Sequence, residues 1–344
     1  MSSLRYALLV APSSNRVYST AAASLMLAEL GVFNDALLAG ALGDFATLTL
    51  GSVEYVTFSA APLDARAIAI LSNLSSLFAL FVLEGGKLSP VDLSRADRFD
   101  SDLITIQKYA GKTNETFTKL LLNVTLAGSA FAGEFPERRL RVLDPLCGRG
   151  TTLNQALMYG FDCAGVELDK KDFEAYSAFI QRWLKDKRLK HQAQIGHVKG
   201  QRKLDLSLAL DKAAYKKGET IGITFVNADT RATADVYPPR SFDLIVTDAP
   251  YGVQHGSHQT SGKLARGPVE MLREALPAWS AVLRPGGALG IAWNTRVARR
   301  AQLGELLSEA GLVVQDSVFH QGFAHNVDHA ILRDLIVGTK PKAP

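Results

Sequence analysis

The chain has 344 residues, of which 47% are hydrophobic and 21% are charged, a balance typical of globular proteins. This length exceeds what one hydrophobic core usually supports, so we expect two domains. No apolar run approaches the ~20 residues of a membrane-spanning helix, and we expect no membrane partner. The seven histidines and two cysteines show no metal-binding spacing, and so few cysteines favour a reducing, cytoplasmic location. The net charge of +4 permits an anionic partner without requiring one.

The first 86 residues alternate segments typical of strands and helices in the order β-α-β-β-α-β. The segments are YALLV, TAAASLMLAEL, ATLTL, VEYVTFS, ARAIAILSNL and FALFVLE. This order predicts a small ferredoxin-like α+β domain over residues 1–86. Residues 87–113 are polar and contain Pro90 and several aspartates, so we predict a linker there.

The second predicted domain covers residues 114–344. After a predicted helix over residues 115–130, strand-like and helix-like segments alternate as they do in doubly wound parallel sheets. The strand-like segments are RVLD, DCAGVE, ITFVN, FDLIV, GALGIAWN and ILRDLIVG. We therefore predict an α/β domain of Rossmann-like architecture.

The first strand of this domain runs into the turn Asp144-Pro145-Leu146-Cys147-Gly148-Arg149-Gly150-Thr151. Ligands of open α/β sheets bind at such carboxyl ends, where loops from several strands converge. Glycines let the backbone approach a ligand closely, and Asp144 can face a ligand's ammonium group. The GxGxxG spacing of a dinucleotide-binding turn is absent, which disfavours a nicotinamide enzyme.

Two later strand ends also carry acids. Glu167 ends the apolar run before Leu168, where a carboxylate can accept hydrogen bonds from both hydroxyls of a ribose. Asp229 ends the run VNAD and can accept from an adenine amino group. One such acid alone is more often a helix cap or a solvated charge, but three in this order indicate a nucleoside cofactor.

The tetrapeptide Asp248-Ala249-Pro250-Tyr251 follows the strand FDLIV and predicts catalysis at an amine. The lone pair of an exocyclic amine is delocalised into its ring, so acceptors for its two N–H hydrogens would direct that lone pair toward an electrophile. Asp248 can supply one acceptor and the Ala249 carbonyl the other. Pro250 restricts the backbone, and Tyr251 offers a face on which a base can stack.

The motifs DPLCGRGTTL, GVELD, NAD and TDAPYG resemble those of class I methyltransferases. They are most similar to the RNA methylase family that contains the THUMP-associated tRNA guanine-N2 methyltransferases, and the resemblance runs from residue 107 to residue 340. It implies a mostly parallel seven-stranded sheet with an antiparallel last strand, and S-adenosylmethionine (SAM) as the cofactor. A complete THUMP module does not fit in the residues that precede it.

The same resemblance implies the roles of individual residues. Asp144, Gly148 and Gly150 would meet the methionine moiety, Glu167 the ribose and Asp229 the adenine. The cofactor-binding set that we predict is Thr113, Asp144, Pro145, Cys147, Gly148, Gly150, Thr151, Glu167, Leu168 and Asp229, with Thr113 near the methionine carboxylate. The predicted catalytic set is Asp248, Ala249, Pro250 and Tyr251, with no metal.

Three residues depart from the family pattern, because Ala249 stands where a second proline is usual and Leu146 and Arg149 replace commoner residues. These departures leave the target base open. An acid at Asp248 disfavours the protein-glutamine methyltransferases, which carry asparagine there. We predict methylation of guanine N2 in tRNA or another RNA. A DNA methyltransferase for adenine N6 or cytosine N4 remains an alternative, as does a nucleic-acid-binding protein without turnover.

A basic insertion over residues 182–220 favours an RNA partner. Its basic side chains could neutralise phosphates, and a solvated helix face with a loose loop is an equally good interpretation. The cations concerned are Arg182, Lys185, Lys187, Arg188, Lys190, Lys199, Arg202 and Lys203. The ferredoxin-like unit could dock RNA by analogy, the polar segment 254–263 could be a mobile substrate loop, and a small activator protein is a further possible partner.

Overall fold

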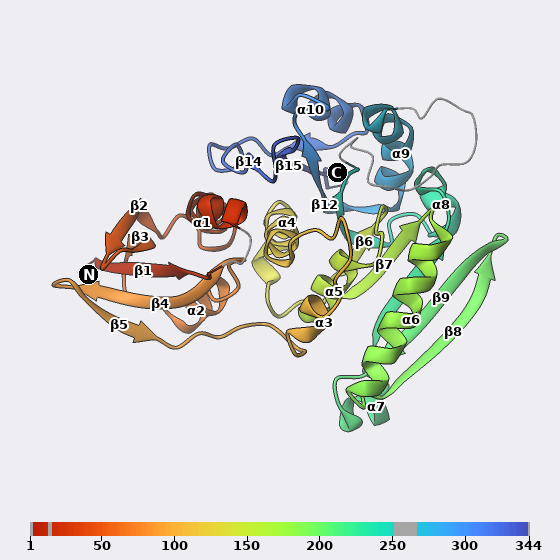
Figure 1. Cartoon of the computed structure of the whole chain (residues 1–344), viewed down its shortest axis with the longest axis horizontal. Helices are drawn as coiled ribbons and strands as arrows, with labels where there is room; N and C mark the ends of the chain where they lie inside the picture. Colours follow the sequence, from red (N-terminus) through yellow and green to blue (C-terminus); the bar gives the residue numbers. More distant parts are fainter. Residues whose placement is uncertain (1–2, 13–15, 251–266, 343–344) are drawn as a thin grey trace.

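The computed structural model describes residues 3–12, 16–250 and 267–342, and it divides into a smaller N-terminal unit and a larger α/β unit (Figure 1). Within those ranges, no helix is long and apolar enough to cross a bilayer. The smaller unit contains β1 (Leu4–Val10), α1 (Arg16–Leu37), β2 (Gly43–Leu50), β3 (Val53–Ala60), α2 (Ala65–Leu71), β4 (Leu77–Glu84) and β5 (Lys87–Val91).

The N-terminal sheet has the strand order β2-β3-β1-β4-β5, and every neighbouring pair is antiparallel. Its first four strands, with α1 and α2, follow the β-α-β-β-α-β order that the sequence predicts, and they are arranged as in ferredoxin-like folds. Tyr6 and Leu8 from β1 and Phe58 from β3 are buried beneath the helices. The order of strand-like and helix-like segments along the chain therefore predicted this arrangement.

The predicted linker is more structured than its polar composition suggests. Strand β5 lies within residues 87–113 and pairs with β4 from Leu80–Val91 to Glu84–Lys87. Helix α3 (Asp102–Thr105) follows in the same segment. The polar composition at the start of this segment fits an edge strand, because the exposed positions of β5 carry polar residues. The division of the chain into domains stays a prediction.

The larger unit begins with α4 (Glu115–Ala127), close to the predicted helix. Its remaining elements are η1 (Ala132–Glu134), β6 (Arg141–Asp144), α5 (Thr151–Met158), β7 (Asp162–Glu167), α6 (Lys170–Asp186), β8 (His191–Val198), β9 (Gln201–Leu208), α7 (Lys212–Lys217), β10 (Ile221–Asn227), η2 (Thr230–Ala232), α8 (Thr233–Val236), β11 (Phe242–Asp248), α9 (Pro268–Val282), β12 (Leu283–Asn294), α10 (Arg300–Glu309), β13 (Val313–Val314), β14 (His325–Asn326) and β15 (Leu332–Thr339).

The central sheet has the order β13-β15-β12-β11-β6-β7-β10-β9-β8, with β14 paired to β15. Strands β10, β7, β6, β11 and β12 are parallel to one another, and β15 is antiparallel to β12. The fold is therefore the class I SAM-dependent methyltransferase fold, as expected. In the part of the chain that the structure describes, the sheet has ten strands in place of the expected seven, because β8 and β9 extend one edge and β14 pairs beside the last strand.

Residues 191–208 of the basic insertion form a β-hairpin in place of a loose loop, whereas Arg182 and Lys185 lie on the exposed face at the end of α6. Strand β9 pairs antiparallel with β10, and β8 pairs with β9 along its whole length. The hairpin therefore projects from the sheet at the end away from the N-terminal unit (Figure 1). Most residues of β8 are exposed, so the strand lacks the apolar alternation that would have predicted it.

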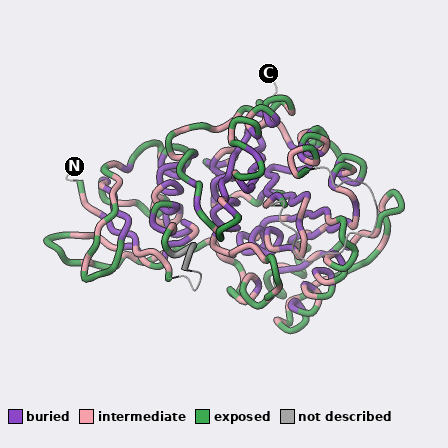
Figure 2. The backbone as a smooth tube through the Cα atoms, turned by 45° about the horizontal axis from the view of Figure 1, so that its top comes forward, coloured by how far each residue is buried: buried purple, intermediate pink, exposed green. Residues whose placement is uncertain are grey.

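Alternate residues of the central strands enter two hydrophobic clusters on opposite faces of the sheet. Leu244 and Val246 of β11 belong to the cluster covered by α4, α5 and α6, and Ile245 belongs to the cluster covered by α8, α9 and α10. Figure 2 shows buried backbone concentrated inside the larger unit and exposed backbone at its periphery. Burial on both faces explains why β11 reads as a continuous apolar run.

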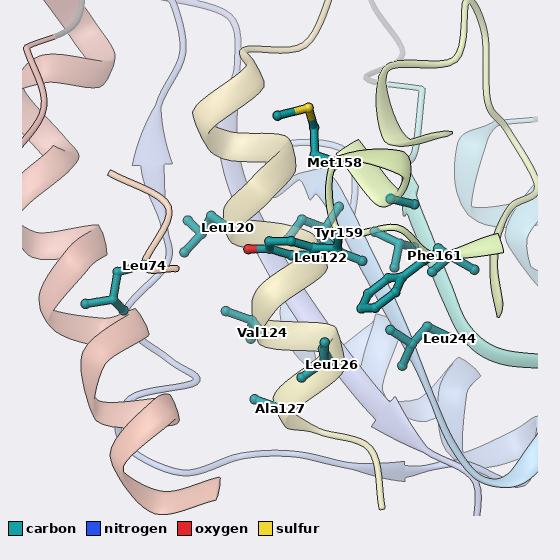
Figure 3. Close-up of a cluster of buried hydrophobic side chains, with 14 of the residues drawn as sticks. Leu74, Leu120, Leu122, Val124, Leu126, Ala127, Met158, Tyr159, Phe161 and Leu244 are labelled. Atoms are coloured by element: carbon teal, nitrogen blue, oxygen red, sulfur yellow. The ribbon is translucent and has the colours of Figure 1, made fainter. Parts of the chain in front are cut away.

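Helix α4 packs between the N-terminal unit and the central sheet. Leu120 and Val124 point toward the side of Leu74 in the N-terminal unit, whereas Leu126 points toward Leu244 of the sheet (Figure 3). A buried polar contact joins the units at the same helix, because the Asn123 amide donates to Glu29 of α1 at 2.6 Å. The N-terminal unit is thus fixed to the helix that leads from the candidate site.

Candidate active site

A cavity of about 290 Å³ lies at the carboxyl ends of β6 and β11, beneath the segment that precedes α4. Four parts of the chain form it: the segment before and within α4, the turn after β6 with the start of α5, the first turn of α6, and the end of β11. The lining residues are Tyr109, Ala110, Gly111, Thr113, Phe117, Thr118, Leu121, Asp144, Leu146, Cys147, Gly148, Arg149, Thr151, Thr152, Asp172, Asp248, Ala249 and Pro250. The structure therefore brings the predicted β6 turn and the predicted catalytic turn to one cavity.

Asp144 is the buried carboxylate of this cavity, with 3% of its surface exposed. Its Oδ1 accepts a hydrogen bond of 2.8 Å from the Thr247 hydroxyl and one of 3.1 Å from the Leu146 N–H. Burial raises the pKa of Asp144 to about 6, although these hydrogen bonds and one from Thr152 oppose the rise. A cation beside this carboxylate would favour its ionised form, and the ammonium group of a methionine moiety is such a cation.

Two glycines shape the turn after β6. Gly148 has φ +50°, and a Cβ built there would meet nothing within 4 Å, so the open space beside it is available to a ligand. Gly150 has φ +78°, and a Cβ there would lie 2.3 Å from the ring of Tyr176. Gly148 therefore keeps the cavity open, whereas Gly150 permits the helix α5 to pack against α6.

Glu167 ends β7, lies beside this turn in space and does not line the cavity. Its Oε2 accepts from the Gly148 N–H at 2.8 Å, and its Oε1 accepts from the Asp169 N–H at 2.6 Å. Burial raises the pKa of Glu167, and the two backbone hydrogen bonds oppose the rise. The Gly148 contact places this acid on the continuation of the cavity, where the cofactor's ribose would follow its methionine part.

Asp229 and Leu168 lie outside the cavity. The Arg231 guanidinium forms an ion pair with Asp229 at 2.6 Å, and its side-chain hydrogen bonds lower the pKa of Asp229. Arg231 also reaches Glu274 of α9 at 2.8 Å. Leu168 is 69% exposed. The predicted adenine contact at Asp229 therefore coexists with an ion pair that the sequence did not indicate.

Asp248 ends β11 at the mouth of the cavity. Its Oδ2 accepts a hydrogen bond of 2.7 Å from the Thr113 hydroxyl and lies 3.8 Å from Nη2 of Arg333 on β15. Thr113, which the sequence placed near the methionine carboxylate, contacts the predicted catalytic acid. The contact couples the segment over the cavity to the acid below it.

Of the other predicted catalytic residues, Ala249 is buried, and its N–H donates to the Ala292 carbonyl at 2.8 Å. This bond continues the β11–β12 pairing one residue past the strand, so it fixes the direction of the turn. Pro250 lines the cavity beside it. Tyr251 and the predicted substrate loop over residues 254–263 lie outside the described residues.

Sequence reasoning missed the polar cluster that closes the cavity around Tyr109. The Tyr109 hydroxyl lies 2.9 Å from the Thr151 hydroxyl, and the Arg149 guanidinium stacks over the Tyr109 ring at 5.0 Å. Nε of Arg149 also donates to Asp172 at 2.7 Å. Tyr109 lies within residues 107–340, where the sequence resembles the family, but its partners Thr151 and Arg149 come from the start of α5 and the turn before it. Pro145 and Gly150, predicted to bind the cofactor, are buried and do not line the cavity.

These residues fit SAM. The open space at Gly148, the buried acid Asp144 and the acid Glu167 beyond the turn suit an ammonium-bearing methionine moiety followed by a ribose. SAM supplies a methyl group on a sulfonium, which is electrophilic without a metal. Among the described residues, no group of three or more His, Cys, Asp or Glu side chains could hold a metal ion.

Part of the chain matches a known methyltransferase family. Residues 120–289, a little under half of the chain, match the family described as RMKL-like, methyltransferase domain. The match includes the β6 turn, Glu167, Asp229 and the Asp248 turn. No curated protein matches the chain at a significant level.

Solved methyltransferase structures are similar to this chain at low identity. A 1,6-didemethyltoxoflavin-N1-methyltransferase from Burkholderia thailandensis, crystallised with S-adenosylhomocysteine, is 16% identical, with 67% of this chain and 80% of that chain covered and a TM-score of 0.38. A precorrin-6y C5,15-methyltransferase from Geobacter metallireducens is 12% identical, with coverages of 72% and 98% and a TM-score of 0.39. At such values the likeness bears neither on substrate nor on mechanism.

The sheet order, the cavity at the ends of β6 and β11 and the family match lead to one conclusion. The chain contains a class I SAM-dependent methyltransferase domain, of which residues 120–289 match the RMKL-like family model.

Proposed function

We propose that this protein transfers a methyl group from SAM to an exocyclic amine of a nucleic-acid base, with guanine N2 in RNA, and tRNA in particular, as the target. One observation supports this most strongly. Asp248 stands at the mouth of the cofactor cavity, held by Thr113, and is followed by Ala249 and Pro250 within the region matched to the family. An acid followed by a rigid turn is the arrangement that an amine nucleophile needs.

The chemistry at Asp248 follows from the weakness of the nucleophile. The nitrogen lone pair of an exocyclic amine is delocalised, and a carboxylate that accepts one N–H hydrogen directs the lone pair toward the methyl carbon. As the nitrogen–carbon bond forms and the sulfur–carbon bond breaks, positive charge develops on the nitrogen. Asp248 stabilises that charge and takes up the proton that the nitrogen loses. Holding the two reactants in line supplies much of the remaining rate.

The β8–β9 hairpin and its surroundings support an RNA partner. Four of the eight cations in this region contact carboxylates: Arg182 with Asp186, Lys187 with Asp100, Arg202 with Glu174, and Lys203 with Asp205. Phosphate contacts would therefore fall mainly to Lys185, Arg188, Lys190 and Lys199, and the ferredoxin-like unit offers a second docking surface by analogy. We place the protein in the cytoplasm, and a small activator protein is part of the proposal.

The test is incubation of the purified protein with isotopically labelled SAM and either bulk tRNA or genomic DNA, followed by mass spectrometry of the nucleosides. We expect label in tRNA, in N2-methylguanosine. Asp248→Ala should abolish transfer while S-adenosylhomocysteine still binds, and Asp235→Ala on the exposed side of α8 is the matched control.

Other outcomes separate the alternatives. Label only in DNA, as N6-methyladenine or N4-methylcytosine, would reject the RNA proposal in favour of a DNA amino-methyltransferase. Binding of tRNA without transfer by the unaltered protein would support a binding protein that retains the fold. Failure of calorimetry to detect S-adenosylhomocysteine would overturn the assignment of the cavity itself.

A further inference from the structure

A second cavity, of about 230 Å³, adjoins the cofactor cavity near Asp248. It lies between the start of α4 and the β14–β15 region, and it shares Thr113 with the first cavity. Its lining residues are Lys112, Thr113, Asn114, Glu115, His325, Asn326, Val327 and Arg333. Since Thr113 and Arg333 both reach Asp248, the acid stands where the two cavities meet.

Two side chains of the second cavity are held as a pair. His325 on β14 is the cross-strand partner of Arg333 on β15, and both are almost fully buried. The ring of Phe117 from α4 lies 5.2 Å from the His325 ring and 4.3 Å below the Arg333 guanidinium. Packing against one aromatic ring therefore fixes a hydrogen-bond donor and an imidazole on the same side of Asp248.

The hydrogen bonding of His325 determines which of its nitrogens carries the proton. Nδ1 lies 2.9 Å from the Phe323 carbonyl oxygen, which can only accept, so Nδ1 is the donor. Burial lowers the pKa of His325 to about 4, and the ring is neutral at physiological pH. In this tautomer Nε2 is a hydrogen-bond acceptor. Both side chains line the second cavity, which thus holds a donor fork at Arg333 and an acceptor at His325, with Nε2 covered by its neighbours in this structure.

The three bases that carry a methylatable amine differ in the atoms beside it. In guanine, the amine is flanked by N1–H, a donor, and by N3, an acceptor. In adenine and in cytosine, no ring N–H adjoins the amine, and the flanking ring nitrogen is an acceptor. An acceptor placed beside Asp248 therefore favours guanine, because adenine and cytosine would leave two acceptors facing each other.

We propose that the second cavity receives the base to be methylated, and that Arg333 and His325 read guanine there, with Arg333 donating to N3 and His325 Nε2 accepting from N1–H. This inference rests on the proposed function and extends that function by naming the residues that select the base. Arg333 and His325 lie far from the family motifs in sequence and outside the matched residues 120–289. Asp248 then serves both cavities, as the acceptor for the amine that lies between them.

The experiment changes the target base and one side chain together. The substrate is a synthetic RNA hairpin that copies the methylated site found in bulk tRNA, with either guanine or 2-aminopurine at the target. 2-Aminopurine keeps the amine and N3 but lacks the N1–H and the O6 carbonyl, so the His325 variants identify which part of the preference comes from N1–H. The unaltered protein should show a kcat/KM at least tenfold higher for guanine, the usual size of one such recognition contact.

His325→Leu should lower kcat/KM for guanine about tenfold and bring the guanine to 2-aminopurine ratio close to one. His325→Gln, which retains an acceptor, should recover most of the preference, and Arg333→Gln should lower kcat/KM for both bases. The matched control is His329→Gln, an exposed histidine in the same β14–β15 connection. Affinity for S-adenosylhomocysteine should stay within twofold in every variant, which also shows that each one folds.

A guanine preference that survives His325→Leu unchanged would overturn this inference and leave the proposed function standing. Methylation of adenine or cytosine by the unaltered protein would overturn both, as would the absence of any transfer to nucleic acid.

Discussion

The hydroxyl of Thr113 donates a hydrogen bond of 2.7 Å to Oδ2 of Asp248, and the two residues are separated by 135 positions in the sequence. Thr113 lies in the segment that covers the cofactor cavity, one residue before the N-cap of α4. Asp248 ends the strand that leads to the catalytic turn. The contact therefore links occupation of the cofactor cavity to the orientation of the proposed catalytic acid.

Thr113→Val should reduce kcat by roughly 10- to 100-fold, because a hydrogen bond to a charged group contributes about 1.5–3 kcal/mol. Valine has nearly the same shape and removes only the donor. Thr113→Ser keeps the hydroxyl and should retain most of the activity. Single-turnover methylation of tRNA measures the effect, and equal rates for the serine and valine variants would show that the contact does not orient Asp248.

Binding of S-adenosylhomocysteine should depend on pH through Asp144. Burial raises the pKa of this carboxyl to about 6, and only its ionised form attracts the ligand's ammonium group. Affinity should therefore rise about tenfold per pH unit below 6 and level off above pH 7. Asp144→Asn should weaken binding at pH 8 at least tenfold and remove most of this dependence, as calorimetry at several pH values would show. A wild-type profile as flat as that of the variant would exclude the role.

The sequence revealed those parts of the fold and site that rest on local patterns. The buried strand β11 appears as FDLIV, and its end supplies Asp248 directly. Gly148 and Gly150 indicate the turn after β6 in the sequence. Both have positive φ angles, which residues with a side chain rarely adopt. Strand ends of a parallel sheet meet at one edge, so order along the chain was enough to predict that these turns converge.

What the sequence did not reveal depends on contacts between distant segments. Arg333 belongs to the last strand and reaches Asp248 only because β15 inserts beside β12. The hairpin β8–β9 carries polar residues on an exposed edge, so no apolar period marks it. Asp229 looked like a simple adenine acceptor, but Arg231, two residues on, binds it from within the same turn.

A second pH effect should arise at the junction of the two units, where Glu29 is fully buried. Desolvation raises the pKa of Glu29 from 4.5 to about 7, despite hydrogen bonds from Asn123 and Ser75. A raised pKa in the folded state gives a contribution to stability that is complete below 4.5 and is lost as the pH rises to about 7. Within that window the slope should approach 1.4 kcal/mol per pH unit.

Glu29→Gln keeps an acceptor for Ser75 and Asn123 but cannot ionise. The free energy of unfolding of the wild type, measured relative to this variant in urea, should therefore decrease between pH 5 and pH 7.5. The matched control is Glu305→Gln on the exposed side of α10, which should parallel the wild type. A difference between wild type and Glu29→Gln that stays constant with pH would show that Glu29 is already ionised at pH 5.

Replacing each of the two glycines of the β6 turn by alanine should affect a different property, stability at Gly150 and ligand binding at Gly148. Gly150→Ala forces a side chain into a left-handed backbone and against the Tyr176 ring, so we expect a loss of roughly 2–4 kcal/mol in unfolding free energy. Gly148→Ala meets no neighbour and should lose only about 1 kcal/mol, but its methyl group would enter the space for the methionine moiety. Urea unfolding should thus rank Gly150→Ala as the less stable variant, and calorimetry should rank Gly148→Ala as the weaker binder of S-adenosylhomocysteine. The reverse order in calorimetry would mean that the ligand does not lie against Gly148, and the reverse order in urea would mean that the Tyr176 ring can move away from residue 150.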